Sequence, residues 1–310
     1  MNLNDFLKLS RADVAHLVRE SGNKVCVFPI NGTRRWFSLE YGDKESDDPL
    51  KAYMDLASQN HIGLYQLFFE HGIDTLLTPV FGAELFGRGD EYVQQIGMTG
   101  VARLATHPDF IDFYDSYQVR VRFYGDYMLH LQNTPYAEVL EQMSAITERT
   151  KKYHQHRLFF GVFANNATNA VARLAVQYYQ EHHIIPDEQK IIELYYGEKV
   201  SPVDFFIGFD KFSAFDYPLL ANGEEDLYFT IAPSPYMDDI QLRKILFDHL
   251  YTRQVPDPDY ASISSTEWQQ IRDFYSENSH RVLGVGSLYA GIWVPEHSNF
   301  LKTREENRGD

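Results

Sequence analysis

The chain has 310 residues, of which 44% are hydrophobic and 23% charged, which suffices for one large α/β domain with a sizeable core. Its net charge of -16 argues against nucleic acids and anionic membrane surfaces as partners, because both attract basic faces. Cys26 is the single cysteine, so internal disulfides are not expected. The sequence has no apolar run of transmembrane length and no signal-peptide core, which predicts a cytoplasmic protein without stable membrane insertion.

Strand-like apolar runs alternate with helix-like periodic segments, which predicts an α/β fold with a mainly parallel central sheet covered by helices. The expected strands cover residues 24–30, 73–81, 118–124, 157–164, 203–207 and 227–231. The expected helices cover residues 10–20, 50–71, 92–105, 137–153, 169–181, 187–195, 239–251 and 268–276. We expect one domain over residues 1–255 and a C-terminal extension over residues 256–310 that packs on it and ends in a disordered tail.

Two loops that follow predicted strands carry arginines. In an open parallel sheet, ligands bind at the carboxyl ends of the strands. The first loop reads Asn31-Gly32-Thr33-Arg34-Arg35-Trp36, where the glycine permits a tight turn and the arginines offer forked donors for phosphate oxygens. The second reads Phe81-Gly82-Ala83-Glu84-Leu85-Phe86-Gly87-Arg88. Each pattern alone is weak, because loop arginines are usually solvated.

Taken in order, these loops resemble motifs of the cis-prenyltransferase family, whose best-known members are bacterial undecaprenyl diphosphate synthases. The first loop resembles the family's Asp-Gly-Asn-Gly-Arg-Trp, and the second resembles Phe-Ser-x-Glu-Asn-Trp-x-Arg. Residues 121–126 resemble a strand that ends in Gly-Asp, and Thr150 with residues 158–166 resembles the Thr…Leu-Asn-Ile-Ala-x-Asn segment. Residues 225–236 resemble Glu-Leu-Tyr-Phe…Trp-Pro-Asp-Phe. The resemblance covers residues 24–253 and indicates a divergent, terpene-synthase-like branch.

The resemblance implies the homodimeric undecaprenyl diphosphate synthase fold, with a hydrophobic tunnel that starts at a diphosphate site. It implies Mg²⁺ as cofactor and a prenyl diphosphate as substrate. The residues on the family's diphosphate-binding positions are Gly32, Thr33, Arg34, Arg35 and Arg88. The expected catalytic residues are Asn31, Arg35 and Arg88, the expected metal ligands are Asn31 and Asp226, and Glu84, Phe81 and Phe163 are further pocket residues.

Three departures from the family pattern bear on the reaction. The metal-binding aspartate of the first loop is Asn31, and the glutamate before Leu-Tyr-Phe is Asp226, which can equally be an ordinary acidic loop residue. The family binds isopentenyl diphosphate through an arginine-rich stretch that is replaced here by residues 207–216. That stretch has no arginine and carries two aspartates, so that Lys211 and Ser213 are its remaining phosphate contacts.

These departures favour a terpene synthase or cyclase that ionises a single prenyl diphosphate, farnesyl first and geranylgeranyl second, with Mg²⁺-assisted diphosphate release. The alternatives are a chain-elongating or irregularly condensing cis-prenyl diphosphate synthase, and a non-catalytic partner subunit of an active cis-prenyltransferase. Aromatic residues can line a carbocation pocket, although any single one is more often core. The candidates are Phe159, Phe160, Phe163, Phe205, Phe206, Phe209, Phe212 and Phe215. Residues 281–295 can form a lid, extend a dimer interface or simply pack on the domain.

Overall fold

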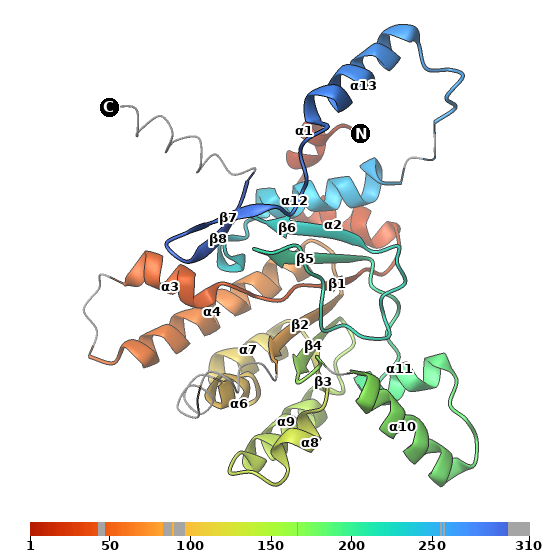
Figure 1. The fold of residues 1–310 in the computed structure, drawn as a ribbon. Helices are drawn as coiled ribbons and strands as arrows, with labels where there is room; N and C mark the ends of the chain where they lie inside the picture. Colours follow the sequence, from red (N-terminus) through yellow and green to blue (C-terminus); the bar gives the residue numbers. More distant parts are fainter. Residues whose placement is uncertain are drawn as a thin grey trace.

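Six strands, every adjacent pair parallel, form the central sheet in the order β3-β4-β2-β1-β5-β6 (Figure 1). The computed structural model describes residues 1–42, 47–82, 89, 97–165, 167–254, 256 and 258–296. The strands are β1 Val25–Val27, β2 Thr75–Phe81, β3 Val119–Tyr124, β4 His156–Val162, β5 Phe205–Phe209 and β6 Asp226–Thr230. The predicted α/β fold with a parallel central sheet is confirmed.

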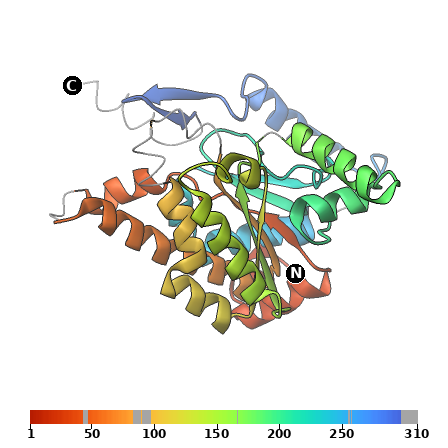
Figure 2. The same cartoon turned by 90° about the horizontal axis from the view of Figure 1, so that it is seen from below.

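Helices cover both faces of this sheet, because the central strands bury both of theirs. In β1, Val25 and Val27 pack on one face and Cys26 on the other. The Cys26 face is covered by α1 Leu3–Leu7, α2 Arg11–Glu20, α4 Pro49–Glu70, α6 Thr99–Thr106, α7 Pro108–Ser116, α8 Tyr127–Leu131, α9 Ala137–Thr150 and α12 Asp239–Phe247. The opposite face is covered by α10 Ala167–His182 and α11 Glu188–Tyr196. Figure 2 shows α6, α7 and α9 on one side and α10 and α11 on the other.

The loop after β1 is shorter than the sequence predicts. A loop is expected through Trp36, but helix α3, Thr33–Tyr41, begins immediately after Gly32. Gly32 has φ 79°, and a Cβ at this position would lie 2.7 Å from the Phe209 ring and 2.9 Å from Pro233. A side chain is therefore excluded both by the left-handed backbone and by the two neighbours. As a result, Arg34 and Arg35 lie in the first turn of a helix.

The remaining elements lie mostly towards the C-terminus. A 3₁₀ turn, Ser234–Tyr236, precedes α12, and a π-helical turn, Asp248–Thr252, follows it. Helix α13, Ser265–Asn278, buries no residue and projects from the body of the molecule in Figure 1. Within residues 281–295, β7 Gly286–Tyr289 and β8 Ile292–Pro295 form an antiparallel hairpin. Among the described residues, no helix has the length and apolar character that crossing a bilayer requires.

Candidate active site

A cavity of about 940 Å³ lies at the carboxyl ends of β1, β2 and β5. The chain passes from β1 to β2 on one side and returns later to β5 on the other, so β1 is the topological switch point where open α/β sheets bind ligands. The loop after β1, one face of α4, the end of β2, α6 with its preceding turn, and the loop after β5 supply the walls. The lining residues from α4 are Tyr53, Met54, Ala57, Ser58 and His61.

The loop after β1 is held in place by a segment more than 200 positions away in the sequence. The backbone N–H of Asn31 donates to Ser234 Oγ at 3.1 Å, and the N–H of Ser234 donates to the Asn31 carbonyl at 3.0 Å. The first intrahelical bond of α3 runs from the Trp36 N–H to the Gly32 carbonyl at 2.9 Å. The earlier N–H groups of α3 have no intrahelical acceptor, so this end of the cavity favours an anion.

Arg35 adds a positive charge to the same end of the cavity. Its Nη2 lies 3.2 Å from Asp210 Oδ2, and its guanidinium carbon lies 5.1 Å from the centroid of the Phe209 ring. Asp210 has φ 72°, and its second carboxylate oxygen, Oδ1, is buried without a hydrogen-bond partner. One carboxylate and one ring therefore hold the guanidinium at the cavity wall, where an anionic ligand can compete for it.

Most of the predicted diphosphate-binding residues come together in this cavity. Its wall includes every member of the first-loop set, namely Asn31, Gly32, Thr33, Arg34 and Arg35, together with Phe81 from the second loop. The two other predictions from the second loop, Glu84 and Arg88, lie outside the described residues. Lys211 and Ser213 also line the cavity.

Phe163 does not line this cavity, contrary to the prediction. It is buried in the core, where its ring packs edge-on against Phe81 at 5.2 Å between centroids. Among the other candidate aromatics, Phe209 and Phe215 line the cavity. Phe159, Phe160, Phe205 and Phe206 are fully buried core residues, and Phe212 stacks on Phe229 at 4.7 Å. Core packing therefore accounts for most of the aromatic set.

The predicted pairing of Asp226 with Asn31 is not what the structure shows. Asp226 is the first residue of β6, and the amino ends of parallel strands lie at the sheet edge opposite the cavity. Its carboxylate accepts from His249 Nδ1 at 2.7 Å and from Arg253 Nη1 at 3.1 Å. Asp226 therefore lies on a strand of the central sheet, but at the amino end of that strand and away from the cavity. The described residues contain no cluster of three or more His, Cys, Asp or Glu that could hold a metal.

Several cavity residues were not identified from the sequence. Arg103 of α6 donates from Nε to Ser58 Oγ at 3.2 Å and from Nη2 to Asp55 at 2.6 Å, which links α6 to α4. His61 lies on the same face of α4 as Ser58, and burial lowers the pKa of its imidazole to about 4. The signal was present, because residues 54, 57, 58 and 61 follow the helical period and include two polar side chains on an otherwise apolar face.

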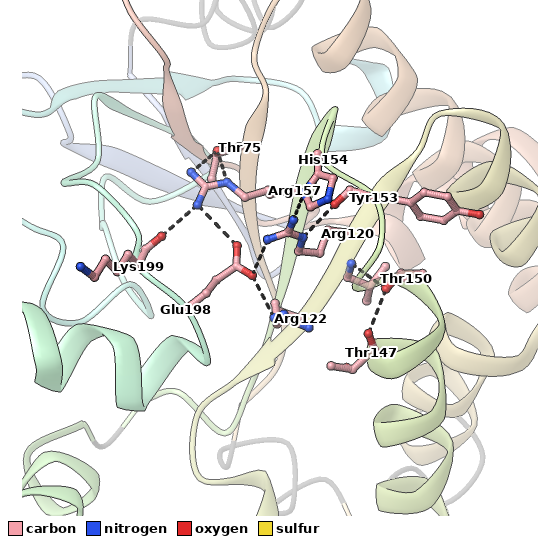
Figure 3. Close-up of polar contacts among 11 residues, drawn as sticks. Thr75, Arg120, Arg122, Thr147, Thr150, Tyr153, His154, Arg157, Glu198 and Lys199 are labelled. Atoms are coloured by element: carbon pink, nitrogen blue, oxygen red, sulfur yellow. Dashed lines mark hydrogen bonds and ion pairs between the residues drawn. The ribbon is translucent and has the colours of Figure 1, made fainter.

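A second group of arginines lies away from the cavity, around Glu198 in the loop that follows α11 (Figure 3). In this Glu198 cluster, the carboxylate lies 3.3 Å from Arg120, 3.1 Å from Arg122 and 3.5 Å from Arg157. Arg120 also donates to the Tyr153 carbonyl at 2.8 Å, and Arg157 to Thr75 Oγ1 at 2.8 Å. The cluster joins the loop after α11 to the amino-terminal parts of β2, β3 and β4.

The comparison with solved structures identifies the fold. Lavandulyl diphosphate synthase from Lavandula x intermedia, in complex with dimethylallyl diphosphate, superimposes with a TM-score of 0.59 at 15% identity, over 74% of this chain and 95% of that one. A probable undecaprenyl diphosphate synthase from Campylobacter jejuni gives a TM-score of 0.53 at 14% identity, over 76% and 97%. The chain therefore has the fold of the cis-prenyltransferase class.

Sequence comparison then places the chain within that class. It is 42% identical over 301 residues to tuberculosinyl adenosine transferase from Mycobacterium tuberculosis, covering 96% of this chain and 100% of that protein. It is 22% identical over 286 residues to (+)-kolavelool synthase from Herpetosiphon aurantiacus, covering 91% and 92%. No protein-family model matches the chain. The chain belongs to the terpene-synthase-like branch of the cis-prenyltransferase superfamily, and it is an enzyme.

Proposed function

We propose that this enzyme binds one prenyl diphosphate, ionises it, and lets a small nucleophile or proton loss, not a second diphosphate, end the reaction. The observation that carries this proposal is the Arg35–Asp210 pair within one cavity. Arg35 and the start of α3 attract one diphosphate, whereas the neighbouring carboxylate repels another. The loop that contains Asp210 has no arginine, and Lys211 is its one basic residue.

The two ends of the cavity suit the two ends of such a substrate. The diphosphate would lie at the start of α3, and the prenyl chain would lie along Met54, Ala57, Val101 and Leu104 of α4 and α6. When the carbon–oxygen bond breaks, its electron pair leaves with the diphosphate. The N–H groups of α3 and the guanidinium of Arg35 stabilise the developing negative charge.

We include Mg²⁺ as a proposed cofactor that neutralises charge on the leaving diphosphate. The fit to this chain is limited, because Asn31 supplies a neutral oxygen and Asp226 lies at the opposite edge of the sheet. Among the described residues that line the cavity, Asp210 is the only one with a carboxylate. Mg²⁺ commonly binds through one or two carboxylates together with substrate phosphates and water, so the ion would depend mainly on the substrate.

The cavity volume favours a long prenyl chain. Small-molecule sites are commonly about 300–1,000 Å³, and this cavity of about 940 Å³ is near the upper end of that range. We therefore propose that the enzyme prefers geranylgeranyl-length substrates to farnesyl-length ones. Rates with linear and with already cyclised prenyl diphosphates can be compared directly.

The resemblance to homodimeric enzymes also leads us to propose a homodimer.

A nucleoside is a second candidate for the capturing nucleophile, beside water. The relative with 42% identity is named as an adenosine transferase. In this chain, Phe209 and Phe215 offer aromatic rings and Asp210 offers an acceptor oxygen on the same side of the cavity. A neutral base with N–H donors suits that wall better than an anion does.

The test is incubation of the purified enzyme and Mg²⁺ with C15 and C20 diphosphates, with and without isopentenyl diphosphate or adenosine, followed by product analysis. We expect diphosphate release without isopentenyl diphosphate, giving an alcohol or alkene, or a prenyl nucleoside when adenosine is present. Products that form only with isopentenyl diphosphate and grow by five-carbon steps would refute the proposal. Asp210→Asn is the informative variant, because removing the carboxylate should weaken discrimination against a second diphosphate.

A further inference from the structure

His61 lies on the cavity-facing stripe of α4 and has an unusual environment. Its Nε2 is buried without a hydrogen-bond partner. The residue as a whole is half-buried and lines the cavity. A buried polar atom without a partner is costly for folding, which makes a purely structural role for this ring unfavourable.

The position of His61 along α4 places it near the proposed diphosphate end. The preceding residue, Asn60, donates from Nδ2 to the Pro235 carbonyl at 3.1 Å. Pro235 follows Ser234, whose hydroxyl accepts from the Asn31 N–H. The turn of α4 that carries His61 is therefore joined to the segment that anchors the first loop. Met54 lies about two helical turns away towards the other end of α4.

The other titratable groups of the described cavity wall are less suitable as bases. The carboxylate of Asp210 is paired with Arg35, and Lys211 and the arginines offer hydrogen-bond donors without an acceptor lone pair. The imidazole of His61 is neutral at pH 7, because burial lowers its pKa to about 4. A neutral imidazole keeps one nitrogen lone pair and does not repel a neighbouring carbocation by charge.

We propose that His61 is the catalytic base that takes the proton of the nucleophile as it captures the prenyl cation. The inference rests on the proposed function above. The lone pair of water or of a hydroxyl group forms the new bond to carbon, and the positive charge passes to the oxygen. One O–H bond then breaks, its electrons stay on the oxygen, and the proton moves to the imidazole. The resulting imidazolium returns the proton to solvent when the product leaves. A buried imidazole is a weak base, but the oxonium formed on capture is a strong acid.

The test compares wild type with His61→Phe and His61→Gln, using one prenyl diphosphate and measuring released diphosphate, captured product and alkene together. Without the imidazole, the cation loses a proton from carbon more often. We expect the ratio of captured product to alkene to fall at least tenfold in His61→Phe. The matched control is Tyr65→Phe, one turn further along α4, where the side chain is buried outside the cavity and the ratio should not change.

The outcomes separate the two levels of the proposal. Unchanged product ratios in both His61 variants, with normal diphosphate release, would overturn the role of His61 and leave the proposed function intact. In that case the released diphosphate, and not His61, would accept the proton that the nucleophile loses. If wild type releases no diphosphate from a single prenyl substrate, the proposed function and the role of His61 both fail. His61→Gln keeps a polar edge on α4, so it provides the comparison if His61→Phe does not fold.

Discussion

The cavity and the Glu198 cluster both place arginines against carboxylates, but only the cavity leaves room for a ligand. In the cluster, three guanidinium groups share Glu198 and add carbonyl, hydroxyl and imidazole partners from Tyr153, Thr75 and His154. In the cavity, Arg35 has one carboxylate and one aromatic ring. The difference teaches that arginine content does not identify an anion site. An arginine that already has protein partners on several sides serves the fold, whereas one that faces a cavity can serve a substrate.

The largest effect that this comparison predicts is on catalysis. Arg35→Ala should lower kcat/KM by about 10–100-fold, because a charge-assisted contact is worth about 1.5–3 kcal/mol. Stability should change little, since the pair with Asp210 is partly exposed. Steady-state kinetics and thermal melts measure both quantities. Arg88→Ala is expected to act in the same direction, and wild-type kinetics in both variants would place the diphosphate elsewhere.

The cluster should show the opposite pattern. Glu198→Ala leaves three part-buried arginines without their shared carboxylate, and we expect a loss of roughly 1–3 kcal/mol in the free energy of unfolding. The kcat/KM should remain near that of wild type, because no member of the cluster lines the cavity. Urea denaturation and kinetics on the same preparation test this. A tenfold loss of activity with unchanged stability would break the distinction between the two regions.

A smaller effect concerns the metal. Asn31→Asp adds a charged oxygen to the cavity wall and should lower the Mg²⁺ concentration needed for half-maximal rate a few-fold. Asp226→Ala should leave that concentration unchanged, because its carboxylate lies at the opposite edge of the sheet and pairs with Arg253. Rates measured across a Mg²⁺ titration distinguish the two sites. A higher Mg²⁺ requirement in Asp226→Ala would show that this residue reaches the ion after all.

The smallest effect is on the pH dependence of stability. The folded-state pKa of His61 is about 4, lowered by burial, against about 6.5 when unfolded. Between these values the unfolded chain binds the extra proton, so the free energy of unfolding falls as the pH drops from about 6.5 towards 4. His61→Phe should show a shallower fall over that window. A Glu198→Gln variant is the matched control, because it leaves His61 unchanged and should keep the part of the slope due to His61.

The fold could be predicted well from the sequence because its signals are local. The apolar run at residues 203–207 and the helical period of 50–71 identify a strand and a helix before any contact is known, with the strand displaced by two residues from β5. The first-loop site could also be predicted, because its residues are contiguous. The start of α3 was missed, because the motif resembles a loop. The position of Gly32, where the loop ends and α3 begins, depends on its packing against Phe209 and Pro233, which the sequence does not reveal.

The cavity wall could be predicted only in part. His61 and Arg103 carry no motif, and their position depends on how α4 and α6 pack over the sheet. Asp226 was misplaced because a sequence motif does not say which end of a strand carries a side chain to the ligand edge. Phe163 was misplaced for a related reason, since buried strands and cavity walls use the same aromatic residues.

The bonds between Asn31 and Ser234 have a consequence for folding order. They join residues separated by 203 positions, and Gly32 also lies against Phe209 at the end of β5 and Pro233 after β6. Contacts of such long range form late, because a large loop must close first. A chain still being synthesised can form β1, α3 and α4 well before residue 234 emerges, yet the anion-binding loop would lack its anchor. Binding competence therefore arises only when nearly the whole domain has been made, and fragments ending before residue 233 should bind no diphosphate.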